Sequence, residues 1–142
     1  MTIAAILHNK GSEVLTVGGD TPVREAVALL AERRIGALPV VSEGEVVGIM
    51  SERDVIYCLS SDGAAMLDWP VERIMTAPAI TVEPKKQIMG ALSLMTQRRI
   101  RHLPVVEGGR LVGLVSIGDL VKYRIDRIEE EAEAMRAYIQ NA

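Results

Sequence analysis

The feature that most constrains this chain is an internal repeat. When the sequence is aligned with itself at an offset of 65 residues, residues 14–56 match residues 79–121 without a gap, and more than a third of the positions are identical. Many of the other positions exchange one apolar residue for another, as in Val23/Ile88. A fixed offset of this size indicates two copies of one structural unit.

Each copy predicts the same order of elements: strand, helix, strand, strand, helix. Alternating apolar runs and a helical spacing of apolar residues carry this prediction. In the first copy the elements are residues 14–17, a helix that buries Val23, Ala26, Val27 and Leu30, residues 38–41, residues 46–50 and a helix that begins at Ser51. So small a sheet cannot cover both of its faces alone. We therefore expect an α/β (α+β) fold in which two βαββα units pack about a pseudo-two-fold axis around one shared core.

The two ends of the chain and the segment between the two copies predict three further helices. A helix is expected before the first copy, and Asp68-Trp69-Pro70 predicts a helix start in the connection. These elements divide the chain into a first repeat with the N-terminal helix (1–68), a second repeat (69–124) and a C-terminal amphipathic helix (125–142).

Composition excludes several classes of function. The net charge of −3 and pI near 5.4 argue against a nucleic-acid binder, which needs a basic face. No apolar run is long enough to span a membrane, and residues 1–11 lack a signal-peptide pattern. Cys58 is the only cysteine, so it predicts neither an internal disulfide nor a zinc site. We expect a cytoplasmic protein that binds no metal and no membrane.

The sequence also lacks the usual signatures of catalysis. It contains no P-loop, no GxGxxG, no HExxH and no GxSxG, and only two histidines. Few routes to acid–base or nucleophilic chemistry remain. The sequence therefore predicts a binding protein, not an enzyme.

Four short motifs carry a resemblance to a known family. GIMSERD (48–54) and GLVSIGD (113–119), together with IGALPVV (35–41) and IRHLPVV (100–106), resemble the CBS (cystathionine-β-synthase) domain in tandem. VERIMT (71–76) also resembles the approach to a second CBS repeat. The similarity extends from about residue 6 to residue 123.

The resemblance implies a function. Tandem CBS pairs form a disc-like module with adenosine-containing ligands in the clefts between repeats: AMP, ADP, ATP, NAD(H) or S-adenosylmethionine. Such modules commonly form homodimers and signal to a regulated protein by a conformational change. The alternative is a ligand-independent oligomerisation or protein-interaction module with degenerate clefts.

Ser51 and Asp54, and their counterparts Ser116 and Asp119, have the spacing of a capping box at a helix N-terminus. Capping alone explains this pattern. The resemblance adds that the Ser contacts phosphate, which a helix N-terminus attracts, and that the Asp binds ribose hydroxyls. The two roles are compatible.

The resemblance also implies that each cleft takes one wall from one repeat and the Ser/Asp pair from the other. One cleft would combine Thr21, Ile35 and Ala37 with Ser116 and Asp119. The other would combine Lys86, Ile100 and His102 with Ser51 and Asp54. For Ile35, ordinary core packing is an equally good explanation.

The copies differ where charge matters most. Arg101 and His102 match positions where the family places basic residues against phosphates, often near the Asp119 cleft, whereas the first repeat has Gly36 and Ala37. Because a guanidinium suits phosphate oxygens, we expect one cleft to prefer a charged nucleotide and the other to be weaker or differently selective. Arg53, just inside the second helix of the first repeat, would partly compensate for the basic residues that this repeat lacks at 36 and 37. The alternative for Arg101 is that it is only a solvated surface residue.

The C-terminal helix carries an apolar stripe with three- and four-residue steps. Its members are Val121, Ile125, Ile128, Ala132, Met135 and Ile139. Either this helix folds back on its own module, or it forms a dimer contact joined by Ile3, Ile6 and Leu7. Its length on so small a body favours the dimer.

Overall fold

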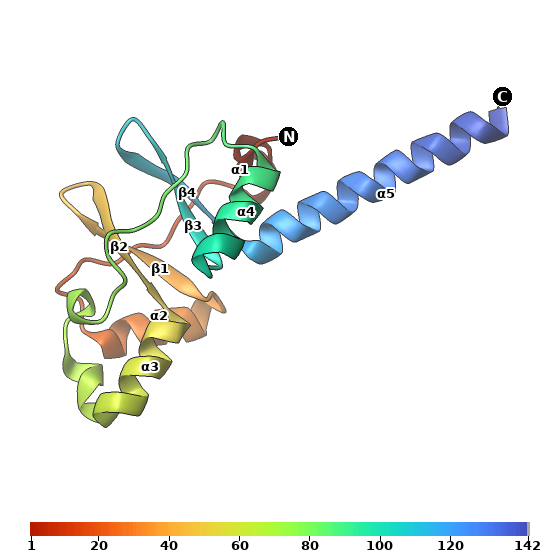
Figure 1. The fold of residues 1–142 in the computed structure, drawn as a ribbon. Coiled ribbons are helices and arrows are strands. Elements are labelled where there is room, and N and C mark those ends of the chain that lie inside the picture. The colour runs from red at the N-terminus through yellow and green to blue at the C-terminus, as the bar shows by residue number, and fades with distance from the viewer. Residues whose placement is uncertain (142) are drawn as a thin grey trace.

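The computed structural model describes residues 1–141 and contains five α-helices, two short 3₁₀ helices and four strands in that range (Figure 1). They are α1 (Ile3–Lys10), α2 (Val23–Arg33), β1 (Ala37–Ser42), β2 (Glu45–Ser51), α3 (Glu52–Asp62), η1 (Gly63–Asp68), η2 (Val71–Arg73), α4 (Ile88–Arg98), β3 (His102–Glu107), β4 (Arg110–Ser116) and α5 (Ile117–Asn141). The predicted α/β fold, with two repeats, an N-terminal helix and a long C-terminal helix, is confirmed.

The two hairpins have the same strand register at equivalent residues. β1 pairs with β2 and β3 with β4, both antiparallel, and each pair has an irregularity one residue after the strand proline, at Val40/Val41 and Val105/Val106. Ala37 faces Ser51 across the first hairpin, as His102 faces Ser116 across the second. Each hairpin therefore delivers its serine to the start of the following helix.

The first strand predicted for each repeat is reduced to one parallel bridge. Val17 pairs only with Val40, through hydrogen bonds from Val17 N to the Pro39 carbonyl and from Val41 N to the Val17 carbonyl. The next bond of a parallel ladder would need an N–H at Pro39, which proline lacks. The second repeat repeats this truncation at Val82, because Pro104 follows the same pattern.

Helix α1 packs on the second repeat, although it precedes the first in sequence. Ile3 and Ile6 are buried in the core of the second repeat. Ile3 N donates to the Lys86 carbonyl at 2.9 Å, and Ile88 N donates to the Met1 carbonyl at 3.1 Å. The start of the chain thus pairs with the entry to α4.

The connection between the repeats makes the corresponding contact with the first repeat. Met66 and Val71 are fully buried in its core. Val71 N donates to the Thr21 carbonyl at 2.8 Å, and Val23 N donates to the Trp69 carbonyl at 2.8 Å. Instead of the longer helix expected after Pro70, the chain makes only the 3₁₀ turn η2. Each repeat is therefore completed by the segment that leads into the other repeat.

The structure has two cores instead of the single shared core that we expected, so that expectation is wrong. The buried residues form two clusters, one in each repeat. The first-repeat cluster is Val17, Val23, Ala26, Leu30, Leu38, Val40, Met50, Met66 and Val71. The second-repeat cluster is Ile3, Ile6, Val82, Ile88, Ala91, Met95, Leu103, Val105, Val115 and Leu120. Because an exchanged segment covers each small sheet, neither repeat needs the other's sheet to bury its apolar face.

Helix α5 is continuous from the Ser116 corner to Asn141, so the closing helix of the second repeat and the C-terminal helix are one element. Its first turns pack on the body, and the rest projects away from it (Figure 1). No helix within residues 1–141 combines the length and the apolar character needed to cross a membrane.

Candidate functional site

One cavity between the repeats, which we call the Asp54 cleft, collects four of the residues that the sequence predicts. Ser51 and Asp54, from the start of α3, line it together with Ile100 and His102 from the second repeat. The cavity holds about 100 Å³, and its remaining lining is Ile49, Arg53, Thr76, Pro78, Ala79 and Ile80. The structure therefore brings residues of both repeats together in one cavity, as expected for this cleft.

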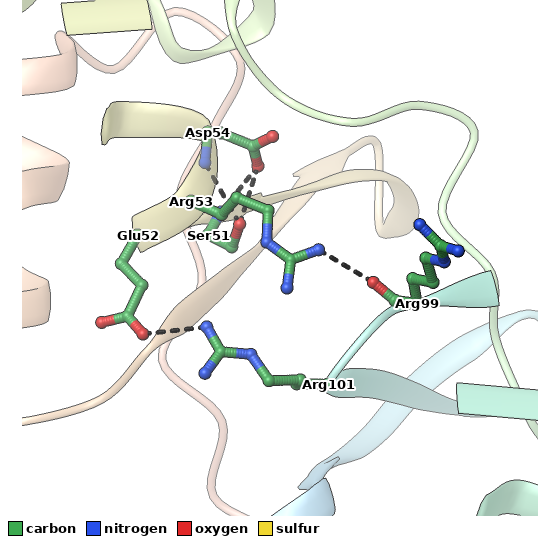
Figure 2. Close-up of polar contacts among 6 residues, drawn as sticks. All are labelled: Ser51, Glu52, Arg53, Asp54, Arg99 and Arg101. Atoms are coloured by element: carbon green, nitrogen blue, oxygen red, sulfur yellow. Dashed lines mark hydrogen bonds and ion pairs between the residues drawn. The ribbon is translucent and has the colours of Figure 1, made fainter. Parts of the chain in front are cut away.

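The Ser51/Asp54 pair forms a complete capping box at α3. Asp54 Oδ2 accepts from Ser51 N at 2.8 Å and from Ser51 Oγ at 3.1 Å, while Asp54 N donates to Ser51 Oγ at 3.4 Å (Figure 2). The second carboxylate oxygen, Oδ1, accepts from the hydroxyl of Thr76 at 2.9 Å. Thr76 is exposed, so a competing hydroxyl can replace its bond to Asp54 at little cost.

Two arginines span the repeats beside this cleft (Figure 2). Arg53 Nη1, from α3, donates to the Arg99 carbonyl at 2.8 Å, and Arg101 Nη2 lies 3.1 Å from Glu52 Oε1. Arg101 is therefore placed against the residue after Ser51, and not against Asp119. Its side chain is 46% exposed, so the pair with Glu52 contributes little stability and leaves the guanidinium accessible to an anion.

The second cavity, which we call the Asp119 cleft after the residue expected to line it, holds about 410 Å³. Ile35 and Ala37 line it, as expected, opposite Leu114 of β4. The rest of its lining is Lys10, Glu13, Val14, Leu15 and Arg33. Ser116 and Asp119, which we expected in this cleft, are not among its lining residues. They cap α5, with Ser116 N donating to Asp119 Oδ2 at 2.8 Å and Asp119 N to Ser116 Oγ at 3.1 Å.

Lys10, at the end of α1, lines this cleft and binds Asp119 outside its lining. Its Nζ lies 2.6 Å from Asp119 Oδ2 and 2.8 Å from the Leu114 carbonyl oxygen. Burial alone would raise the pKa of Asp119, but hydrogen bonds from Lys10 and Ser116 outweigh it and hold that pKa below its usual value. A ligand hydroxyl must therefore compete with an ammonium group for this carboxylate. Nothing in the repeat pattern points to Lys10, because it lies before the first copy.

Thr21 and Lys86 lie outside both sets of cleft-lining residues. Their carbonyl groups accept the hydrogen bonds from Val71 and Ile3 that hold the exchanged segments. The residue before the first helix of each repeat thus serves the packing between repeats.

His102 lies between the two clefts. It lines the Asp54 cleft, and its Nε2 lies 3.0 Å from the point where a Cβ on Gly36 would stand. Burial, followed by the positive charge of Arg101, lowers the pKa of His102 below its ordinary value of 6.5, against the opposing effect of Glu52. The imidazole is therefore neutral near pH 7 and can hydrogen-bond a neutral base.

The lowered pKa of His102 predicts a loss of stability in mild acid. Because the native state binds this proton less well than the unfolded state, the stability is complete above pH 6.5 and decreases as the pH falls from there toward the native pKa. We expect His102→Gln to flatten the pH dependence of the unfolding midpoint across this window. The exposed His8 supplies the control variant His8→Gln. An unchanged slope in His102→Gln would show that His102 does not carry this dependence.

Comparisons with known proteins agree with this architecture. A mitochondrial CBS domain-containing protein from Arabidopsis thaliana, CBSX3, is 36% identical over 98% of this chain and 72% of its own length. The crystal structure of a CBS-domain-containing protein from Agrobacterium tumefaciens superposes with a TM-score of 0.84 at 38% identity, over 87% of this chain and 99% of that one.

A second similar structure contains ligands. The CBS domain pair of protein MJ0100, solved in complex with 5′-methylthioadenosine and S-adenosyl-L-methionine, has a TM-score of 0.79 at 26% identity and covers 89% of this chain and 98% of its own. The family model of the CBS domain matches twice, at residues 9–61 and 71–126. With both repeats matched, this chain belongs to the CBS domain family.

Proposed function

We propose that this protein is a regulatory sensor that binds an adenosine-containing ligand in the Asp54 cleft. The observation that carries the proposal is the convergence of a capped helix N-terminus and a carboxylate from one repeat with Ile100 and His102 from the other. The helix N-terminus attracts phosphate, and the Asp54 carboxylate can accept ribose hydroxyls. That a similar CBS pair binds two adenosine compounds supports this ligand class.

The charges beside the cleft favour a phosphorylated ligand. Arg53 lines the cavity, and the partly exposed Arg101 lies nearby on Glu52. Both guanidinium groups can bind phosphate oxygens. We therefore rank AMP, ADP and ATP above S-adenosylmethionine, with NAD(H) as a further candidate. The Asp119 cleft is the weaker site, because Asp119 lies outside its lining and Lys10 already holds the Asp119 carboxylate.

The size of the Asp54 cleft suggests how binding becomes a signal. A volume of about 100 Å³ is below the roughly 300–1,000 Å³ of most ligand pockets. A nucleotide therefore has to push out the Thr76–Ile80 segment, which forms one wall and is held by a bridge between Ile49 and Thr76. This segment connects the two repeats, so its displacement changes their relative packing. A regulated protein partner would respond to that change.

The same small volume favours the second candidate, a ligand-independent interaction module with degenerate clefts. Under either candidate we expect a non-enzymatic, cytoplasmic homodimer. The ligand response separates the two.

The deciding experiment is a thermal-shift titration of the full chain with AMP, ATP, NADH and S-adenosylmethionine, followed by calorimetry. We expect AMP or ATP to raise the unfolding midpoint, since a ligand at a hundred times its Kd adds about 2.7 kcal/mol. Guanosine monophosphate serves as the control for the base. If none of the four adenosine compounds raises the midpoint, the sensor proposal fails and the interaction module remains.

A further inference from the structure

Helix α5 leaves an apolar stripe without cover. Leu120 is fully buried and Tyr123 packs on the core of the second repeat, but the helix then projects away from the body (Figure 1). The large side chains of the stripe are between 41% and 65% exposed. The stripe consists of Val121, Ile125, Ile128, Ala132, Met135 and Ile139. Most of a helix's stability in a protein comes from packing of its apolar face, so we expect this face to pack against a partner.

The spacing of the stripe is that of a coiled coil. Steps of four and three alternate from Val121 to Ile139, which puts Ile125, Ala132 and Ile139 at a positions. The d positions are then Val121, Ile128 and Met135. A stripe with this spacing packs against a further helix with the same pattern. A second copy of α5 supplies it.

The charges beside the stripe select the direction of pairing. In a parallel pair, each g residue faces the e residue five places later on the partner helix. Arg124 at g then faces Glu129 at e, and Glu131 at g faces Arg136 at e. Two-fold symmetry gives four pairs of opposite charge. Within residues 1–141, none of these four side chains forms an ion pair in its own chain.

An antiparallel pair meets repulsion instead. In that arrangement e residues face e residues, and g residues face g residues. The register that aligns the apolar stripes then places Glu129 against Glu129, Glu131 against Glu131 and Lys122 against Arg136 of the other copy. Like charges at these positions disfavour the arrangement.

The stripe lies beside the face of α5 that packs on the body. At 100° per residue, the stripe is centred roughly a quarter turn round α5 from Leu120, the residue that faces the body. The other copy can therefore approach without displacing the packing of Leu120.

We propose that α5 forms a parallel two-stranded coiled coil with α5 of a second copy, held by Arg124–Glu129 and Glu131–Arg136 pairs. Both bodies then lie at the same end of the coiled coil. This pairing needs no ligand, so it stands or falls independently of the sensor proposal.

Charge reversal on the full chain tests the pairing without any ligand. Glu129→Lys places a second positive charge opposite Arg124, so we expect the dimer Kd from analytical ultracentrifugation to rise about tenfold or more. Adding Arg124→Glu should restore the dimer. Glu133→Lys makes the same charge change at an outward b position and is the matched control. A monomeric wild-type chain, or a dimer that Glu129→Lys does not weaken more than Glu133→Lys, would overturn the proposal.

A cross-link tests the direction. In a Cys58→Ser background, Ile128→Cys places two d-position thiols opposite each other in a parallel pair, and mild oxidation should join them into a dimer. In an antiparallel pair, residue 128 instead faces residue 132. Cross-linking of Ile128→Cys only with an Ala132→Cys chain, and not with itself, would refute the parallel arrangement.

Discussion

Asp54→Ala is expected to abolish the response to AMP or ATP while the protein stays folded. In the proposed complex the carboxylate accepts two ribose hydroxyls, and a hydrogen bond to a charged group contributes about 1.5–3 kcal/mol. Losing both raises the ligand Kd about a hundredfold or more. The substitution also removes the capping box of α3, which costs about 0.5–2 kcal/mol of stability. The measurement is therefore calorimetric binding at a temperature where circular dichroism shows a folded variant.

Three further variants separate binding from capping. Asp54→Asn keeps an oxygen that can cap α3 but lacks the charge, so it should lose most of the affinity and little stability. Thr76→Val removes only the hydroxyl that contacts Asp54 and should leave binding intact or slightly tighter. Asp119→Ala should weaken binding less than Asp54→Ala, because Lys10 already engages Asp119. If Asp54→Ala binds AMP as well as the unchanged protein does, this cleft is not the nucleotide site.

The repeat predicted most of the fold because each copy repeats its local signals. The Ser/Asp capping boxes and the apolar runs at residues 38–41 and 103–106 each specify an element by themselves. The first strand is different, because its length depends on whether the facing residue can donate a hydrogen bond. Pro39 and Pro104 cannot donate this hydrogen bond. The sequence alone does not show that they face the first strand, because that depends on the register of the bridge.

The clefts were predictable where they depend on the repeat and unpredictable where they depend on the ends. Ser51, Asp54, Ile100 and His102 meet in one cavity, as the resemblance to the CBS family implied. Lys10 was missed because α1 crosses to the second repeat, and a pattern of repeated motifs contains no information about that crossing. Thr21 and Lys86 lie outside the cavity linings, and their carbonyls accept hydrogen bonds from the connection and from α1, respectively.

Ile3→Ala is expected to destabilise the second repeat and not the first, although Ile3 precedes the first repeat in sequence. Its side chain is fully buried in the cluster with Ile88 and Leu103. Truncating a buried isoleucine to alanine costs about 2–5 kcal/mol, a large part of the stability of a domain of this size. Urea unfolding should show the loss as a lower midpoint.

Amide hydrogen exchange locates the effect, since local opening reports on the weakened region. We expect exchange to accelerate more in β3, β4 and α4 than in β1, β2 and α2. Val71→Ala makes the corresponding change in the first repeat, where Val71 is fully buried, and should reverse this pattern. Met89→Ala, at an apolar side chain that is 58% exposed, should change neither. Because the exchanged segments hold the two repeats in register, faster exchange confined to β1 and β2 in Ile3→Ala would contradict the crossing of α1 and, with it, the placement of Lys10 on Asp119.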